Sequence, residues 1–133
     1  VGTTPVLLAI HHPPFTTGIK FMDDIGLAHP DALAAILAEF PGELRIVCGH
    51  IHSMIVTTFA GRVSVSSPSP CSSFAYDLRI AAPVGFMDEE DGFLIHRWDA
   101  GFRTIRVGLH AGPGPFPFNA PQIPPPSEDP SHG

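Results

Sequence analysis

Two short, largely apolar runs separated by one helical segment constrain the fold of this chain more than any other feature. Val6–Ile10 and Leu44–Cys48 have the character typical of strands that are buried on both faces. A helical pattern lies between them, within "HPDALAAILAEFPG". Strand, helix and strand in this order form a β-α-β unit, in which the two strands lie parallel. The sequence therefore predicts an α/β fold.

The predicted helix begins at Pro30, which suits a first helical turn, and is stopped by Pro41. Asp31 lies in that first turn, where an acidic side chain complements the helix dipole. The residues expected to form its apolar face are Leu33, Ile36, Leu37 and Phe40. The stretch before it, His11–Leu27, lacks helical periodicity and contains several prolines and glycines, which predicts a long loop.

After His52 the apolar residues alternate with polar ones, which predicts antiparallel strands. The expected strands are Met54–Phe59 paired with Arg62–Ser67, then Phe74–Ala81, then Phe93–Trp98 paired with Phe102–His110. The predicted domain therefore covers residues 1–110, as a β-α-β unit followed by antiparallel hairpins. Residues 111–133 are rich in proline and glycine, and this composition predicts an extended or disordered tail.

Composition limits the partners and the compartment. The chain of 133 residues is long enough for one small domain or for part of a larger one. Its net charge of -6 disfavours a nucleic-acid polymer as partner, because phosphates require basic side chains. No apolar run has the length of a membrane span, and the two cysteines suggest no disulfide framework. These features predict a soluble, cytoplasmic protein without a membrane partner, in which Cys48 is buried.

Four histidines follow the two predicted parallel strands. His11 and His12 come directly after the first strand, and His50 and His52 come just after the second. The carboxyl ends of parallel strands meet at one edge of a sheet, where ligands gather. Neutral imidazoles bind Zn, Fe, Mn, Ni or Co, so the pattern predicts a metal site at this edge. An extended backbone would point His50 and His52 the same way, whereas a turn would aim them at two neighbouring ions.

The stretches that carry these histidines resemble a known family. "AIHHPPFTTGIKFMD" followed by "RIVCGHIHS" is similar to the calcineurin-like metallophosphoesterases, above all to their bacterial cyclic-nucleotide phosphodiesterases and glycerophosphodiesterases. The similarity runs from Val6 to about Met54. It implies a two-sheet αββα sandwich, of which this chain would be the C-terminal part. It also implies two divalent ions (Fe, Mn, Zn or Co) and hydrolysis of a small-molecule phosphodiester, with 3',5'-cyclic nucleotides first and glycerophosphodiesters second.

The resemblance assigns roles to individual residues. His11 and His50 match ligands of the second metal, and His52 matches a ligand of the first. His12 has no agreed metal role, so it either orients its loop or approaches the substrate as a catalytic group. For Asp23 the alternatives are a contact to substrate and the cap of a turn, and for Tyr76 they are stacking on a base and an ordinary strand position. Ser72 or Ser73 could meet the phosphate, or belong to an ordinary loop.

Other motifs of the family are missing. Its Asp-x-His, Gly-Asp and Gly-Asn-His motifs do not occur here, and three neutral imidazoles offset none of the four positive charges on two divalent ions. The internal carboxylates that could substitute are Asp23, Asp24 and Asp77. We therefore expect a C-terminal fragment with weak metal binding, little activity alone, and exposed sheet edges that also permit a homo-oligomer. The alternatives are a phosphomonoesterase and a non-enzymatic metal-binding or interaction domain.

Overall fold

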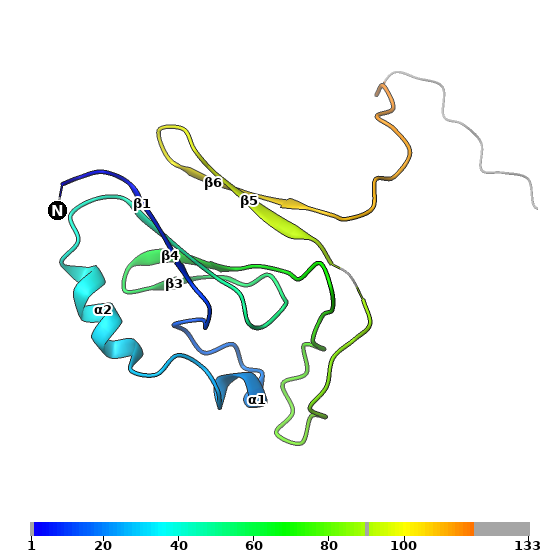
Figure 1. Cartoon of the computed structure of the whole chain (residues 1–133), viewed down its shortest axis with the longest axis horizontal. Helices are drawn as coiled ribbons and strands as arrows, with labels where there is room; N and C mark the ends of the chain where they lie inside the picture. The colour runs from blue at the N-terminus through cyan, green and yellow to red at the C-terminus, as the bar shows by residue number, and fades with distance from the viewer. Residues whose placement is uncertain (1, 90, 119–133) are drawn as a thin grey trace, which may run out of the picture.

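The computed structural model describes residues 2–89 and 91–118, which form the α/β fold that the sequence predicts (Figure 1). A four-stranded sheet has the order β1-β2-β4-β3, and a separate two-stranded sheet pairs β5 with β6. Within these described ranges, no helix is both long enough and apolar enough to cross a membrane. The part of the predicted tail from residue 119 onward lies outside the described residues.

The predicted β-α-β unit is confirmed. Strands β1 (Val6–Ile10) and β2 (Leu44–Cys48) have the predicted bounds and pair in parallel, from Val6 opposite Leu44 to Ile10 opposite Cys48. Helix α2 (Pro30–Ala38) connects them and ends two residues before the predicted limit at Phe40. Because the strands are parallel and in register, the residues that follow Ile10 and Cys48 emerge side by side at one edge of the sheet.

The first predicted hairpin is also confirmed, and it extends the same sheet. Strands β3 (Val56–Phe59) and β4 (Arg62–Ser66) are antiparallel, and β4 runs parallel to β2. The two turn residues, Ala60 and Gly61, have φ angles of 49° and 71°. A type I′ turn requires positive φ at both central residues, and its twist matches the twist of the two strands that it joins.

The main core lies between α2 and one face of the sheet. Leu37, Leu44 and Ile46 are buried there, and Leu33 and Phe40 pack against them. The prediction that Ile36 shares this face is wrong, because its side chain is 70% exposed. Positions 33, 37 and 40 follow one narrow stripe of the helix, whereas position 36 lies at the margin of the stripe, where the sheet does not cover it.

The stretch predicted as one long loop contains a short helix, α1 (Lys20–Asp23), so that prediction is wrong at this point. Ile19 and Met22 are buried together with Ile51, which belongs to the loop after β2. A helix this short has no stability of its own and leaves no periodic pattern in the sequence. It forms here because burial against a distant loop stabilises it.

The predicted strand Phe74–Ala81 does not form. The segment 67–89 contains one isolated bridge, between Ser73 and Met87, and no named strand. Ile80 is 87% exposed, and Leu78 is also exposed. An alternating pattern becomes a strand only where a neighbouring strand pairs with it, and no strand of the described residues pairs with 74–81.

The final hairpin consists of β5 (Phe93–Trp98) and β6 (Phe102–Val107), the latter ending three residues before the predicted His110. It lies on the opposite side of the sheet from α2 (Figure 1). Arg45 of β2 joins the two sheets: its Nη1 donates to Thr104 Oγ1 at 2.8 Å, and its Nη2 donates to the Phe102 carbonyl at 3.3 Å. Ile95 and Ile105 remain nearly half-exposed on the outer face.

Candidate metal centre

The histidine-bearing loops after β1 and β2 are joined by their backbones. The Gly49 N–H donates a hydrogen bond of 3.0 Å to the carbonyl of His11. This bond continues the contact between the two parallel strands by one step beyond their ends. It fixes the distance between the His-His-Pro-Pro loop and the Gly-His-x-His loop at the carboxyl edge of the sheet, where ligands gather in α/β folds.

The backbone turns sharply at His50. The Ile51 N–H donates to the Gly49 carbonyl at 2.8 Å, and His50 has a φ of 68°, which together define a γ-turn. His52 also has a positive φ, of 50°. Such conformations of residues other than glycine cost about 1–3 kcal/mol and cluster at functional sites. Of the two alternatives that the sequence left open, the turn is the one observed.

Three imidazoles meet at this edge. One ring nitrogen from each of His11, His12 and His50 lies within 4.8 Å of the other two. The ring centroids are 4.9 Å apart for His11 and His12, 5.2 Å for His11 and His50, and 4.4 Å for His12 and His50. His12, whose role the sequence left open, is therefore part of the cluster. Three imidazoles with an open fourth position are a set that binds zinc and similar ions.

The surroundings of His50 favour its neutral form. Its pKa is lowered from the usual value, first because burial disfavours the charged ring, and then because His12, His11 and His52 lie nearby. Its Nε2 is buried and has no hydrogen-bond partner. A buried polar atom without a partner is costly, and neutral imidazole nitrogen is the form that binds a metal. The residues therefore fit a divalent ion at this point.

His52 lies beside the three-histidine cluster but outside it. Its Nδ1 is 3.2 Å from the Ser72 hydroxyl, and its ring lies 4.7 Å from the Phe74 ring at an angle of 31°. It is nevertheless close enough to His50 to lower the pKa of that residue. The γ-turn at His50 thus sends two nearby imidazoles to different surroundings. The sequence missed the contacts from Ser72 and Phe74, because they come from a loop that is distant along the chain.

The candidate carboxylates are occupied elsewhere. Asp23 accepts hydrogen bonds from the backbone and hydroxyl of Thr17 and from the Gly18 N–H, which is the turn-capping role. Asp24 pairs with Lys20. Hydrogen bonds from Arg79 lower the pKa of Asp77 to about 2. Among the described residues, the grouping that includes His11, His12 and His50 contains no carboxylate.

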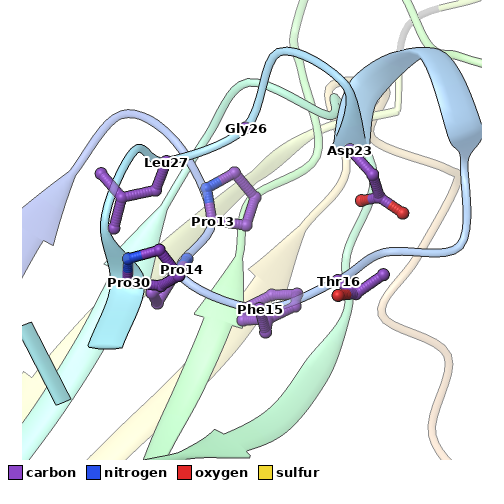
Figure 2. Close-up of a pocket in the computed structure, with 8 residues that line it drawn as sticks. All are labelled: Pro13, Pro14, Phe15, Thr16, Asp23, Gly26, Leu27 and Pro30. Carbon is purple, nitrogen blue, oxygen red and sulfur yellow. The ribbon is translucent and has the colours of Figure 1, made fainter. Parts of the chain in front are cut away.

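A pocket of about 170 Å³ opens beside the first histidine loop. It begins at Pro13, directly after His12, and is lined by both apolar and polar groups (Figure 2). The rings of Pro13, Pro14 and Pro30 gather with Leu27 at one end, and Thr16 and Asp23 lie at the other. Tyr76 is 61% exposed, and its hydroxyl donates to the Thr17 carbonyl at 3.4 Å, so it covers the loop rather than the histidine cluster.

Comparison with known proteins supports the phosphodiesterase resemblance. The chain is 34% identical over 116 residues to a probable glycerophosphodiester phosphodiesterase of Arcobacter nitrofigilis, covering 85% of this chain and 42% of that protein. It is 37% identical over 106 residues to a 3',5'-cyclic adenosine monophosphate phosphodiesterase of Pseudomonas aeruginosa, covering 80% and 35%. The corresponding Escherichia coli K12 protein is 35% identical over 68 residues, covering 51% and 25%.

No protein-family model matches the chain. The chain spans less than half the length of each of these relatives. The names of these relatives all describe hydrolysis of a phosphodiester bond. The motifs and the curated relatives therefore point to the same broad class of hydrolase.

Proposed function

We propose that this chain supplies the histidine part of a metal-dependent phosphodiesterase centre. The observation that carries the proposal is the cluster of three imidazoles, in which the Nε2 atom of His50 is buried without a partner. A site of this kind is unfavourable when empty and favourable when a cation meets the free nitrogen. The names of the relatives support phosphodiester hydrolysis as the chemistry.

His11 and His50 hold one divalent ion in this proposal, and His52 holds a second ion beside it. His12 completes the cluster on the side that the substrate approaches. An ion bound there would act as a Lewis acid that stabilises negative charge on the phosphoryl oxygens. The γ-turn at His50 and the hydrogen bond from Gly49 to His11 hold these imidazoles in place before any ion binds.

The pocket beside the histidine cluster receives the organic part of the diester. It starts one residue after His12, so a phosphate at the histidine cluster would place one ester substituent toward Pro13 and Leu27. Proline and leucine side chains beside the Asp23 carboxylate suit a nucleoside or a glycerol chain better than a second phosphate. We propose 3',5'-cyclic nucleotides as the first substrate class and glycerophosphodiesters as the second. Asp23 shapes the wall by holding Thr17 and Gly18, and Tyr76 covers that loop.

A complete dinuclear centre requires carboxylates that the described residues do not bring to the cluster. Two divalent ions carry four positive charges, which neutral imidazoles do not offset, and Asp23, Asp24 and Asp77 each serve another group. We propose that the chain belongs to a two-sheet αββα sandwich of calcineurin-like type and requires further acidic residues for full activity. It would then bind one ion weakly and have little activity alone.

Calorimetric titration with Mn²⁺, Zn²⁺ and Co²⁺, followed by an assay on bis-(p-nitrophenyl) phosphate, tests this proposal. We expect weak binding of at least one ion and hydrolysis far below that of a full-length relative. His50→Ala should abolish the binding, and the control His110→Ala, in the exposed stretch after β6, should not. Absence of any binding would favour a non-enzymatic domain, and full turnover by the chain alone would contradict the need for further carboxylates. Preference for p-nitrophenyl phosphate would indicate a phosphomonoesterase.

A further inference from the structure

The ring of His52 is held by a segment that no part of the proposed centre uses. The hydroxyl of Ser72 lies 3.2 Å from its Nδ1 atom, and the ring of Phe74 lies against its face with 4.7 Å between centroids. A hydrogen bond fixes the rotation of an imidazole in its plane, and a ring contact fixes the plane itself. Together the two contacts determine where Nε2, the other ring nitrogen, lies.

This segment is itself anchored on both sides. Ser73 exchanges backbone hydrogen bonds of 3.2 Å and 2.7 Å with Met87, which ties the segment to the stretch around that residue. Phe74 packs edge to face against Phe21 of α1, with 5.7 Å between centroids. Phe21 in turn packs on the buried cluster that includes Ile51, the residue just before His52. The backbone of His52 and the two groups that hold its ring therefore belong to one packed unit.

We propose that Ser72 is a positioning residue that selects the tautomer of His52. A neutral imidazole carries one proton, on either Nδ1 or Nε2, and the hydrogen bond at one nitrogen determines the state of the other. A serine hydroxyl at 3.2 Å can accept or donate; in the proposed arrangement it accepts from Nδ1–H, and the Nε2 lone pair is left free for a metal ion. This inference rests on the proposed function only for the use of Nε2; the tautomer itself is a property of the metal-free chain.

The tautomer is measured by long-range ¹H–¹⁵N correlation spectra of the labelled, metal-free chain at pH 8, above the ordinary imidazole pKa. We expect wild-type His52 to carry its proton on Nδ1. Ser72→Ala should move the population toward Nε2–H, and Ser72→Thr, which keeps the hydroxyl, should restore the wild-type spectrum. Ser73→Ala is the matched control, because its backbone bonds to Met87 do not need a side chain, and it should leave His52 unchanged.

The same variants are then titrated with Co²⁺. Loss of a hydrogen bond that orients a metal-binding histidine typically costs about 10- to 100-fold in affinity, so we expect that loss in Ser72→Ala and recovery in Ser72→Thr. A wild-type His52 protonated on Nε2, or a tautomer that Ser72→Ala does not change, would overturn the inference without requiring any variant to bind metal. A tautomer that depends on Ser72 in a chain that binds no ion would support the positioning role and count against the proposed function.

Discussion

Two regions each contain a histidine whose pKa is lowered by burial: the sheet edge with the three histidines, and the seam between the two sheets, where Arg45 meets Thr104 and His96. The two sites differ in what surrounds the histidine ring. At His50 the next causes of the lowered pKa are other imidazoles, and its Nε2 has no partner. At His96 the next cause of the lowered pKa is Arg45, and its Nδ1 lies 3.0 Å from the Thr104 hydroxyl.

The contact between the two sheets is a series of hydrogen bonds that links Arg45 to Thr104 and Thr104 to His96. Arg45 donates to Thr104 Oγ1, so the hydroxyl proton of Thr104 is free to be donated to Nδ1 of a neutral His96. Every polar group named there has its partner inside the chain, whereas the histidine edge leaves a nitrogen unpaired. A lowered histidine pKa therefore does not identify a binding site; the unmet hydrogen-bonding capacity of the ring does.

The largest effect expected from this difference is on metal binding by His50→Ala. This substitution removes the ring nitrogen that has no other partner. We therefore expect the affinity for Zn²⁺ or Co²⁺ to fall by more than about 100-fold, which exceeds the typical loss when a hydrogen bond to a metal ligand is removed. The free energy of unfolding should not fall, because an unpaired buried atom is removed with the ring. Titration calorimetry and urea unfolding check both results. His96→Ala should instead leave the metal affinity unchanged and lower the free energy of unfolding. Equal metal affinity in both variants would contradict the distinction.

Arg45→Met should have the next largest effect, on the seam alone. It removes the hydrogen bonds to Thr104 and Phe102 and the contact of the guanidinium with the Phe102 ring, 5.6 Å from the ring centroid. Hydrogen bonds from a charged group contribute about 1.5–3 kcal/mol, and we expect a loss of that size in the free energy of unfolding. Urea denaturation measures it, with exposed Arg97→Met as the matched control. A loss of metal affinity in Arg45→Met would show that the two regions are coupled.

Thr104→Val should have a smaller effect at the same place. The valine keeps the shape of the side chain but removes the group that links Arg45 to His96. A neutral hydrogen bond is worth about 0.5–1.5 kcal/mol, so the stability should fall by about that amount at pH 8. Amide hydrogen exchange in β5 and β6 should increase more than in β1 and β2. Uniform acceleration across both sheets would show that the hairpin does not unfold separately.

Lowering the pH should produce the smallest change. The pKa of His96 is lowered by burial and then by Arg45, so the folded state prefers the neutral ring. Its contribution to stability is complete above the usual pKa of 6.5 and is lost as the pH falls through the lowered value. Urea unfolding at a series of pH values between 8 and 5 should show this decrease, and His96→Phe should reduce it. Stability that increases on acidification in that range would contradict the assigned direction.

The sequence predicted the framework of the site well, because that framework depends on local patterns. The apolar runs Val6–Ile10 and Leu44–Cys48 became parallel strands with unchanged bounds, and the histidines after each strand necessarily reached the same edge. Apolar runs of this length and the turn residues between them act within a few residues, so they can be read without knowledge of the rest of the fold.

Only the tertiary structure decided how the side chains at that edge are used. His12 joins the cluster and His52 lies apart because of the turn at His50 and the distant contact with Ser72, neither of which has a signature in the sequence. Helix α1 forms through burial against Ile51, and the alternating segment from Phe74 remains without a strand because no neighbour pairs with it. Strand direction is a local property of the chain, whereas the direction of a side chain and the partner that it meets depend on residues far along the sequence.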